Sequence, residues 1–519
     1  MLLHDYLGDT VRRYPGNVAL VAGQERVTYR DLDSRAHRLA AGLYSRGVRR
    51  GDRVAIYLDN GVAAVVAWYA ALRVGAVFML INPLTKRDKL AFVLNDARAS
   101  VLITRQILLS EAIDAVRSAA SVRFVIIAGE HARREPDERY ISWAAAESDA
   151  TIGDPGTIDL DLASIIYTSG STGEPKGVML THLNMTTAAT SVSTYLDLRT
   201  DDKIFCALQL SFDYGLYQVL LAVRLGATVV IEKSFAFPVT ALEVMARERV
   251  TVLPGVPTMF ALLTEVSSLS RFDLSPLRLI TNTAAALSER QIRELRALFP
   301  QATLFSMYGL TECKRVTYLP PEQLDMRPTS VGRGMPNTEV WLVNDAGERL
   351  PNGQTGELVV RGSHVMRGYW EKPEATAERL RPGPYPGEVV LHSGDIFRTD
   401  AEGYLYFVAR KDDIIKTRGE KVSPREVENT IHALDGVSEV AVTGVPDPIL
   451  GQAIKAFIVL REGYQYAERD VIRYCLAHLE NFMAPKVVEF VTRLPMTNTG
   501  KINKKALEGV VSGAGPRTI

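Results

Sequence analysis

A run of hydroxyl and glycine residues that ends in a lysine occupies residues 167–182, which read YTSGSTGEPKGVMLTH. It follows the apolar run Ala163–Ile166, which is typical of a buried strand. A loop of this composition after a strand leaves N–H groups and hydroxyls free to bind a polyphosphate, and Lys176 adds a mobile positive charge. The spacing differs from G-x-x-x-x-G-K-[ST], so composition alone leaves a flexible Gly/Ser turn as an alternative.

Further segments follow at intervals along the chain. Residues 307–312 read MYGLTE, residues 392–395 read HSGD, residues 403–428 read GYLYFVARKDDIIKTRGEKVSPREVE, and residues 498–501 read NTGK. Together with residues 167–182 they resemble the signatures of the adenylate-forming superfamily, which comprises acyl- and aryl-coenzyme A ligases, peptide-synthetase adenylation domains and luciferases. The resemblance covers essentially the whole chain.

The resemblance implies a ligase that joins an acid to ATP, releases pyrophosphate and passes the acyl-adenylate to a thiol. It implies ATP and Mg²⁺ as cofactors, with coenzyme A as co-substrate or a separate carrier protein as acceptor. Lys501 would bridge the acid and the α-phosphate, Thr311 would contact that phosphate, and Glu312 would help to hold Mg²⁺. Without the resemblance, Lys501 would be read as a solvated lysine and Thr311-Glu312 as a helix start.

The resemblance also implies a nucleotide site. Tyr308 would lie against adenine, and Asp395 would accept both ribose hydroxyls with assistance from Arg410, whereas Ser-Gly-Asp alone is turn chemistry. The full set of implied nucleotide-binding residues is Thr168, Ser169, Gly170, Ser171, Thr172, Gly173, Lys176, Ala285, Tyr308, Asp395 and Arg410.

The acid-binding residues are expected to include Asp213, Tyr214, Gly309 and Lys314. Residues 211–216 read SFDYGL and lack the histidine that many fatty-acyl and aryl ligases carry there. In peptide-synthetase domains an aspartate at this place pairs the substrate amine, so Asp213 leaves open a stand-alone amino-acid-activating enzyme. It could equally cap a helix or form a hydrogen bond in the core.

Two adjacent cations, Lys314 and Arg315, directly follow Thr-Glu-Cys. They could be solvated or form salt bridges, or one of them could hold a second anionic group or a small oxyanion. Some branches of the superfamily activate unusual acids, including nitrite in diazotases, which gives a further alternative.

The resemblance implies a mobile C-terminal lid. Asp412 matches the hinge position, where backbone dihedral changes would absorb the rotation of the lid between the two half-reactions. Gly419 would then face the active site and leave space for the thiol arm. We expect an AMP-binding domain at residues 1–411 and a lid at residues 412–519, with no carrier-protein domain following.

Bulk properties exclude several other classes of protein. The chain has 519 residues, too many for one ordinary core, and 60 acidic and 60 basic residues give no net charge that would favour nucleic acid. Three scattered cysteines and no visible signal peptide favour the cytoplasm. The apolar stretch Val62–Leu72 is too short to span a membrane and predicts a buried helix.

Hydrophobic patterning predicts an α/β fold. Short apolar runs such as Val54–Leu58 and Val101–Thr104 alternate with helix-length segments, which favours buried, largely parallel sheets. Thr28 with Asp31 predicts one helix start, and Ser423-Pro424 with Glu426 predicts another. After about residue 330, turn-separated strands such as Glu357–Arg361 indicate a more antiparallel subdomain, followed by a small α+β domain.

Overall fold

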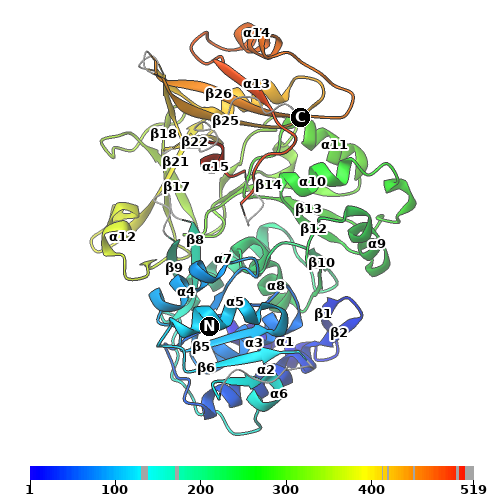
Figure 1. Cartoon of the computed structure of the whole chain (residues 1–519), viewed down its shortest axis with the longest axis vertical. Coiled ribbons are helices and arrows are strands. Elements are labelled where there is room, and N and C mark those ends of the chain that lie inside the picture. The colour runs from blue at the N-terminus through cyan, green and yellow to red at the C-terminus, as the bar shows by residue number, and fades with distance from the viewer. Residues whose placement is uncertain are drawn as a thin grey trace.

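The computed structural model describes residues 1–129, 138–169, 175–411, 413–417, 420–447, 450–497 and 502–508. Figure 1 shows where its helices and strands lie along the longest axis of the molecule. Strands of the first 150 residues lie at one end, and the elements that follow residue 415 lie at the opposite end. The fold is α/β with a small C-terminal α+β part, as predicted.

Two large sheets, predominantly parallel, form the body of the chain. Among the described residues, the first has eight strands in the order β19-β9-β8-β4-β3-β5-β6-β7, and the second has nine in the order β16-β15-β14-β13-β12-β10-β11-β1-β2. The first comprises β19 (Gly368–Tyr369), β9 (Pro175–Thr181), β8 (Leu162–Ser169), β4 (Val77–Leu80), β3 (Arg53–Ile56), β5 (Val101–Arg105), β6 (Phe124–Ala128) and β7 (Tyr140–Ser142). The second comprises β16 (Arg333–Gly334), β15 (Thr317–Tyr318), β14 (Thr303–Tyr308), β13 (Leu279–Asn282), β12 (Val252–Gly255), β10 (Lys203–Cys206), β11 (Thr228–Ile231), β1 (Val18–Ala22) and β2 (Glu25–Thr28).

Helices connect and cover these strands. They are α1 (Leu3–Arg13), α2 (Tyr29–Ser45), α3 (Val62–Arg73), α4 (Arg87–Asp96), α5 (Leu109–Arg117), α6 (Trp143–Ala146), α7 (His182–Tyr195), α8 (Asp213–Leu225), α9 (Pro238–Glu248), α10 (Pro257–Thr264) and α11 (Glu289–Leu298). Helix α2 starts where predicted, because the Thr28 hydroxyl accepts from the Asp31 N–H and the Asp31 carboxylate accepts from the Thr28 N–H. Helix α3 is the predicted buried helix, and α8 is buried on every face from its first residue to Val223.

The predicted antiparallel subdomain follows residue 330. Its described strands are β17 (Glu339–Val343), β18 (Thr355–Arg361), β20 (Leu380–Pro382), β21 (Val389–Thr399) and β22 (Leu405–Arg410), together with helix α12 (Pro373–Arg379). All the pairings within this sheet are antiparallel. The register aligns Asp395 of β21 with Arg410 of β22, which brings two predicted nucleotide residues side by side.

The C-terminal part is built from a second antiparallel sheet with one parallel edge strand. Its elements are β23 (Ile415–Thr417), β24 (Glu420–Val422), β25 (Val437–Asp447), β26 (Gly451–Leu460), β27 (Val487–Phe490), α13 (Pro424–His432), α14 (Glu468–His478) and α15 (Lys504–Glu508). Helix α13 begins as predicted, with the Ser423 hydroxyl accepting from the Glu426 N–H. Arg425 of this helix donates to the Ala286 carbonyl at 3.1 Å, so the C-terminal part contacts the loop after β13.

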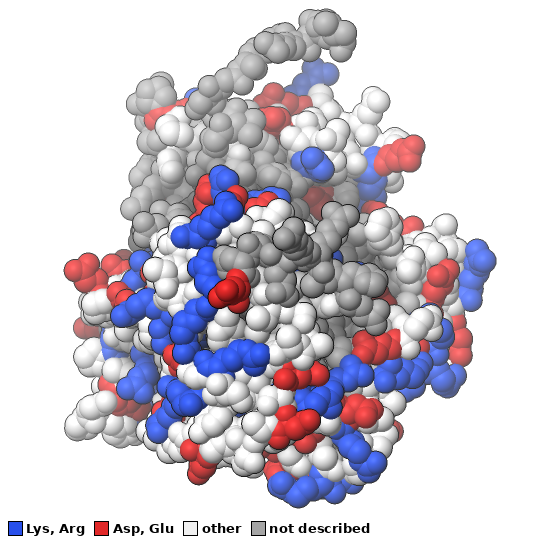
Figure 2. Space-filling model, turned by 60° about the horizontal axis from the view of Figure 1, so that its bottom comes forward, with Lys and Arg blue, Asp and Glu red and all other residues white. Residues whose placement is uncertain are grey.

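The helices and the surface charges both agree with what the composition of the sequence predicts. In the described ranges, no helix combines the length and apolar character needed to cross a membrane. On the face shown in Figure 2, acidic and basic side chains are interspersed with uncharged surface. This distribution fits a chain of zero formal net charge.

Candidate active site

The candidate active site is built around the end of β14. Strands β13 and β14 are parallel neighbours, and both end where predicted site residues begin. In α/β sheets such carboxyl ends are the usual place for ligands, because the connecting loops diverge there. Residues 309–316 form the loop that follows β14, and Tyr308 is the last residue of the strand.

Tyr308, Asp395 and Arg410 form one hydrogen-bonded and charged group. The Tyr308 hydroxyl donates to Asp395 Oδ2 at 2.6 Å, and Arg410 Nε lies 3.7 Å from Asp395 Oδ1. Burial and the neighbouring carboxylate raise the pKa of Tyr308 well above its ordinary value, so its hydroxyl remains a donor at neutral pH. Asp395 is 6% exposed. A buried carboxylate is thereby held in place beside an aromatic ring.

Glu357 supports this group and was not identified from the sequence. Its carboxylate accepts from the Gly394 N–H at 3.0 Å and from Lys411 Nζ at 3.2 Å, and it lies 3.9 Å from His392 Nδ1. Burial would raise the pKa of Glu357, but these neighbours outweigh burial and hold it at about 2. Glu357 therefore ties residues 392–395 of β21 to the end of β22. The sequence showed only a strand there.

Glu312 belongs to a second group that includes another unanticipated residue, Tyr369. The Tyr369 hydroxyl donates to Glu312 Oε1 at 2.8 Å, and Lys176 Nζ lies 5.4 Å from the centre of the Tyr369 ring. These contacts arise because β19 pairs with β9, aligning Tyr369 with Val178. Two predicted phosphate-side residues are thus connected through one tyrosine. No local sequence signal predicts a strand pairing across 190 positions.

The loop between Tyr308 and Arg315 is tightly packed. A Cβ at Gly309 would lie 1.8 Å from the Lys314 carbonyl oxygen, so only glycine fits there. Thr311 is buried, and the Glu312 carbonyl accepts from the Met366 N–H at 2.7 Å. Lys314 has a φ of 67°, a left-handed conformation that non-glycine residues rarely adopt. The packing therefore holds Glu312 and Lys314 in defined positions.

Five buried residues from this loop and α8 form what we term the Lys314 cluster: Asp213, Tyr214, Tyr217, Lys314 and Arg315. Arg315 Nη1 lies 3.7 Å from Asp213 Oδ2, and the Arg315 guanidinium packs 4.4 Å from the centre of the Tyr214 ring. The Tyr214 hydroxyl bonds the Thr281 carbonyl and hydroxyl, each at 2.8 Å. The predicted acid-binding residues Asp213, Tyr214 and Lys314 are therefore gathered beside Gly309.

Lys314 is 0% exposed, and its Nζ has no hydrogen-bond partner in the described part of the chain. It lies 5.9 Å from the centre of the Tyr217 ring. Burial lowers the pKa of Lys314 to about 8, and the nearby carboxylates of Asp213 and Glu312 oppose that shift. The side chain is still mainly an ammonium at neutral pH.

Asp213 does not cap its helix. The N-cap of α8 is Phe212, which makes no side-chain capping bond, and Asp213 is the first helical residue. Its carboxylate is buried next to Arg315 instead. Of the two structural alternatives that the sequence left open, the cap is excluded, and the carboxylate lies in the core at ion-pair distance from Arg315.

The remaining predicted residues lie around the site or outside the described ranges. The Thr168 hydroxyl donates to the Lys176 carbonyl at 3.5 Å, and Ser169 pairs with Pro175 in the sheet. Ala285 is exposed, and its carbonyl accepts from Asn282 Nδ2 at 2.9 Å. Several predicted residues lie outside the described ranges, namely Gly170, Ser171, Thr172, Gly173, Asp412, Gly419 and Lys501.

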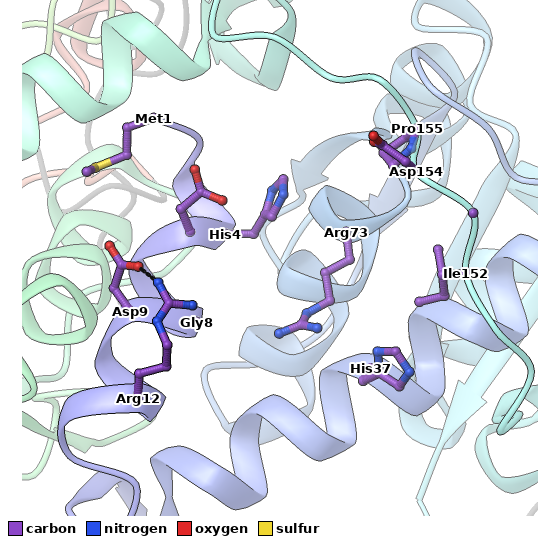
Figure 3. Close-up of a pocket in the computed structure, with 12 residues that line it drawn as sticks. Met1, His4, Gly8, Asp9, Arg12, His37, Arg73, Ile152, Asp154 and Pro155 are labelled. Carbon is purple, nitrogen blue, oxygen red and sulfur yellow. Dashed lines mark hydrogen bonds and ion pairs between the residues drawn. The ribbon is translucent and has the colours of Figure 1, made fainter.

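A separate cavity of about 610 Å³ lies elsewhere in the N-terminal part. Figure 3 shows its lining, which comes from α1, α2, the end of α3 and the chain near residues 152–155. Its lining cations have carboxylate partners, since Arg12 contacts Asp9 and Arg73 contacts Asp33. It contains none of the motif residues, so we do not assign the chemistry to this cavity.

The chain is similar throughout its length to proteins of known activity. The model of the AMP-binding enzyme family matches residues 7–370, and that of the AMP-binding enzyme C-terminal domain matches residues 426–501. A feruloyl-CoA synthase from an Amycolatopsis species is 36% identical over 95% of this chain and 96% of its own length. A long-chain-fatty-acid–CoA ligase from Bacillus subtilis strain 168 is 30% identical over 97% and 94%.

Solved structures show the same relationship. The crystal structure of the anthranilate CoA ligase AuaEII in complex with anthranoyl-AMP superposes with a TM-score of 0.89 at 27% identity, covering 98% of this chain and 97% of that one. Fold, motif order and the grouping at the end of β14 agree with these matches. The chain therefore belongs to the AMP-binding enzyme family and is an AMP-forming acid ligase.

Proposed function

We propose that this enzyme activates a small organic acid with ATP and Mg²⁺ and transfers the acyl group to coenzyme A in the cytoplasm. In the first half-reaction a carboxylate oxygen bonds to the α-phosphorus of ATP, the bond to the β-phosphate breaks, and pyrophosphate leaves. In the second, the coenzyme A sulfur bonds to the acyl carbon and AMP leaves. The proximity of Tyr308 and Asp395 at the end of β14 is the observation that carries this proposal.

Asp395 is suited to a diol. Its carboxylate is buried, and the Tyr308 hydroxyl at 2.6 Å fixes its orientation. A carboxylate has about four lone-pair positions, so it can accept ribose hydroxyls while retaining its tyrosine bond. The Tyr308 ring then lies next to the position of the sugar, which supports an adenine contact. Arg410 supplies positive charge at the same place.

Glu312 is suited to a metal that arrives with the nucleotide. The described residues contain no cluster of three or more metal-ligating side chains. Mg²⁺ in nucleotide sites is commonly held by one or two carboxylates and the substrate phosphates. Glu312 is therefore enough as the carboxylate ligand from the protein. When bound, Mg²⁺ neutralises charge on the phosphate oxygens. Tyr369 orients Glu312 by its hydrogen bond, and Lys176 adds a cation on the same side.

The C-terminal residues are assigned to both half-reactions, Lys501 to the first and Gly419 to the second, with Asp412 at the hinge between the two arrangements. We assign Lys501 to the α-phosphate, Asp412 to the hinge and Gly419 to the thiol path. These roles come from the motifs at residues 403–428 and 498–501. The loop between β22 and β23 is where the proposed lid would turn relative to residues 1–411.

The competing candidate is an amino-acid-activating enzyme that serves a carrier protein. It depends on Asp213 binding the substrate amine. Arg315 lies 3.7 Å from that carboxylate, and Lys314 is also close by, so a third cation there would meet like charges. The arrangement disfavours an amine, and it makes an acid with a second anionic group, or a small oxyanion such as nitrite, the better substrate class.

The test is acid-dependent pyrophosphate release, followed by thioester formation. Purified full-length enzyme is mixed with MgATP and a panel of aryl, fatty, dicarboxylic and amino acids and nitrite, with and without coenzyme A. The proposal predicts pyrophosphate and AMP with at least one acid, and a thioester only after coenzyme A is added. Asp9→Ala, a change in the separate cavity, serves as the control and should leave the rates unchanged. Acid-independent ATP hydrolysis, or release of ADP, would exclude the proposal.

A further inference from the structure

Within the Lys314 cluster, two buried cations face one carboxylate. Lys314 and Arg315 are cationic, and Asp213 is the carboxylate that lies next to them on α8. Glu312 is a second carboxylate close to Lys314, and it keeps its negative charge while it accepts from the neutral Tyr369 hydroxyl; Cys313 carries a neutral thiol. What is missing is hydrogen bonding: buried cationic donors that make no hydrogen bond are unfavourable, so an anionic acceptor is expected here.

The individual donors also lack partners. Within the described ranges, neither Lys314 Nζ nor Arg315 Nε has a hydrogen-bond acceptor, although both side chains are more than nine-tenths buried. The Asp213–Arg315 distance of 3.7 Å exceeds hydrogen-bond length, so this ion pair is not closed. Long cationic side chains usually extend their charged ends to solvent, which Lys314 does not do. At least two buried N–H donor groups therefore make no hydrogen bond to the described residues.

The surroundings hold these cations where they are. The Tyr217 ring lies 5.9 Å from Lys314 Nζ, and the Tyr214 ring faces the Arg315 guanidinium at 4.4 Å. Tyr214 is itself fixed by its bonds to Thr281. The left-handed backbone at Lys314 is maintained by the Lys314 N–H bond to the Leu310 carbonyl, at 2.7 Å, and by the contact at Gly309. Both cations are therefore held without the help of the substrate.

We propose that Lys314 and Arg315, with Asp213 as their counter-ion, form a buried subsite for an oxyanion of the acid substrate. This inference rests on the proposed function, because it defines the substrate class of the same site. Two sources share the required chemistry. One is the second carboxylate of an organic diacid, and the other is a compact inorganic oxyanion such as nitrite. Asp213 limits the net positive charge, so the cluster accepts one anion and disfavours a substrate ammonium.

The first experiment compares acids that differ by one anionic group. Specificity constants from ATP-dependent pyrophosphate release are measured for succinate against butanoate and for terephthalate against benzoate, with nitrite as the compact oxyanion. We expect at least a tenfold preference for one diacid over its monoacid, or nitrite turnover that exceeds both monoacids tenfold. The first result assigns the subsite to a second carboxylate, and the second assigns it to a small oxyanion. Equal rates within each pair and no nitrite turnover would overturn the inference while leaving acid ligation intact.

Variants attribute the preference to the cluster. Lys314→Met, which keeps length and removes charge, should reduce the preference at least tenfold, and Lys314→Arg should retain part of it. Lys455→Met is the matched control, because Lys455 is another buried lysine whose Nζ is paired with Glu489 at 2.7 Å, and it should keep the wild-type preference. Asp213→Asn should keep or increase the preference. A wild-type preference in Lys314→Met, with thermal unfolding that confirms a folded protein, would contradict the proposal.

A binding measurement separates this inference from the ligase assignment. Calorimetric titration of the full chain with each anion, in the presence of Mg²⁺ and α,β-methylene-ATP, needs no turnover. Binding that is weakened at least tenfold by Lys314→Met would support the subsite even if no acid released pyrophosphate. Pyrophosphate release together with anion binding that is unchanged by Lys314→Met would retain the ligase and reject the subsite. If Lys314→Met does not fold, the same titration is made with wild type, Lys314→Arg and Asp213→Asn. Similar affinity for monoanions and dianions in all three of these proteins would reject the subsite.

Discussion

The two halves of the candidate site differ in how their charges are balanced. On the nucleotide side, Asp395 accepts from Tyr308 and faces Arg410, while Glu312 accepts from Tyr369. On the acid side, the Lys314 ammonium and the Arg315 Nε have no acceptor among the described residues. The side chains of the nucleotide side are thus held by hydrogen bonds to one another. Those of the acid side are held by packing, and two of their N–H donor groups make no hydrogen bond to the described residues.

This difference indicates how the fold divides its tasks. A group that binds the same nucleotide in every turnover can be held in advance by internal partners, which lowers the cost of orienting it. A group that selects among acids discriminates best when the correct substrate satisfies donors that other acids leave unpaired. Variants of Lys501, Asp395 and Tyr369 test the nucleotide side, whereas the variants of Lys314 test the acid side.

The largest effect is expected at Lys501. Lys501→Ala should lower the rate of adenylate formation at least about 100-fold, because a preorganised cation on the α-phosphate acts mainly in the transition state. A chemically prepared adenylate should still react with coenzyme A. Lys86→Ala, at an exposed lysine, is the control and should behave as wild type. An adenylation rate within a few-fold of wild type would show that Lys501 lacks this role.

The next effect is expected at Asp395. Asp395→Asn should raise the KM for ATP about 10- to 100-fold, since charge-assisted hydrogen bonds contribute about 1.5–3 kcal/mol each. Tyr308→Phe keeps the carboxylate and removes one donor, so its KM should rise by less. The measurement is initial rate against ATP concentration at a saturating level of the acid. A larger rise in KM for Tyr308→Phe than for Asp395→Asn would contradict the assignment of Asp395 as the main ribose contact.

A smaller effect is expected at Tyr369. Tyr369→Phe removes the 2.8 Å bond to Glu312, and a neutral donor of this kind contributes about 1 kcal/mol. The Mg²⁺ concentration that gives half-maximal pyrophosphate release should therefore rise about fivefold. Tyr385→Phe, at a tyrosine that is 60% exposed, is the matched control. An unchanged Mg²⁺ requirement in Tyr369→Phe would mean that the bond does not orient a metal ligand.

The smallest effect concerns stability rather than catalysis. The pKa of Glu357 is about 2 in the folded protein, below its ordinary value, so its contribution is present above about pH 5 and is lost as pH falls towards 2. Because its partner Lys411 is half-exposed, we expect a contribution of about 1 kcal/mol. Urea unfolding at pH 7 and pH 3.5 should show a difference between wild type and Glu357→Gln that shrinks at the lower pH. A constant difference would contradict the assigned pKa.

The sequence predicted local structure well, for identifiable reasons. The starts of α2 and α13 were predictable because their capping residues lie within three positions of each other. The motifs assigned Asp395 and Tyr308 to one nucleotide site, but the hydrogen bond between them was not predicted. By contrast, the bond between Tyr369 and Glu312 depends on the pairing of β19 with β9, and the role of Glu357 depends on the register of β18 with β21. These contacts join segments that lie far apart in the sequence, and no repeating pattern of residues indicates that such segments pair.

The central claim is most directly tested by isotope exchange. Wild-type enzyme is incubated with ATP, Mg²⁺ and labelled pyrophosphate in the absence of coenzyme A, with each acid of the panel in turn. An AMP-forming ligase must return label to ATP only when a substrate acid is present, because the acyl-adenylate forms reversibly before any thiol acts. We predict acid-dependent exchange in wild type that is lost in Lys501→Ala. Exchange that is independent of the acid, or no exchange with any acid while ADP accumulates, would contradict the account.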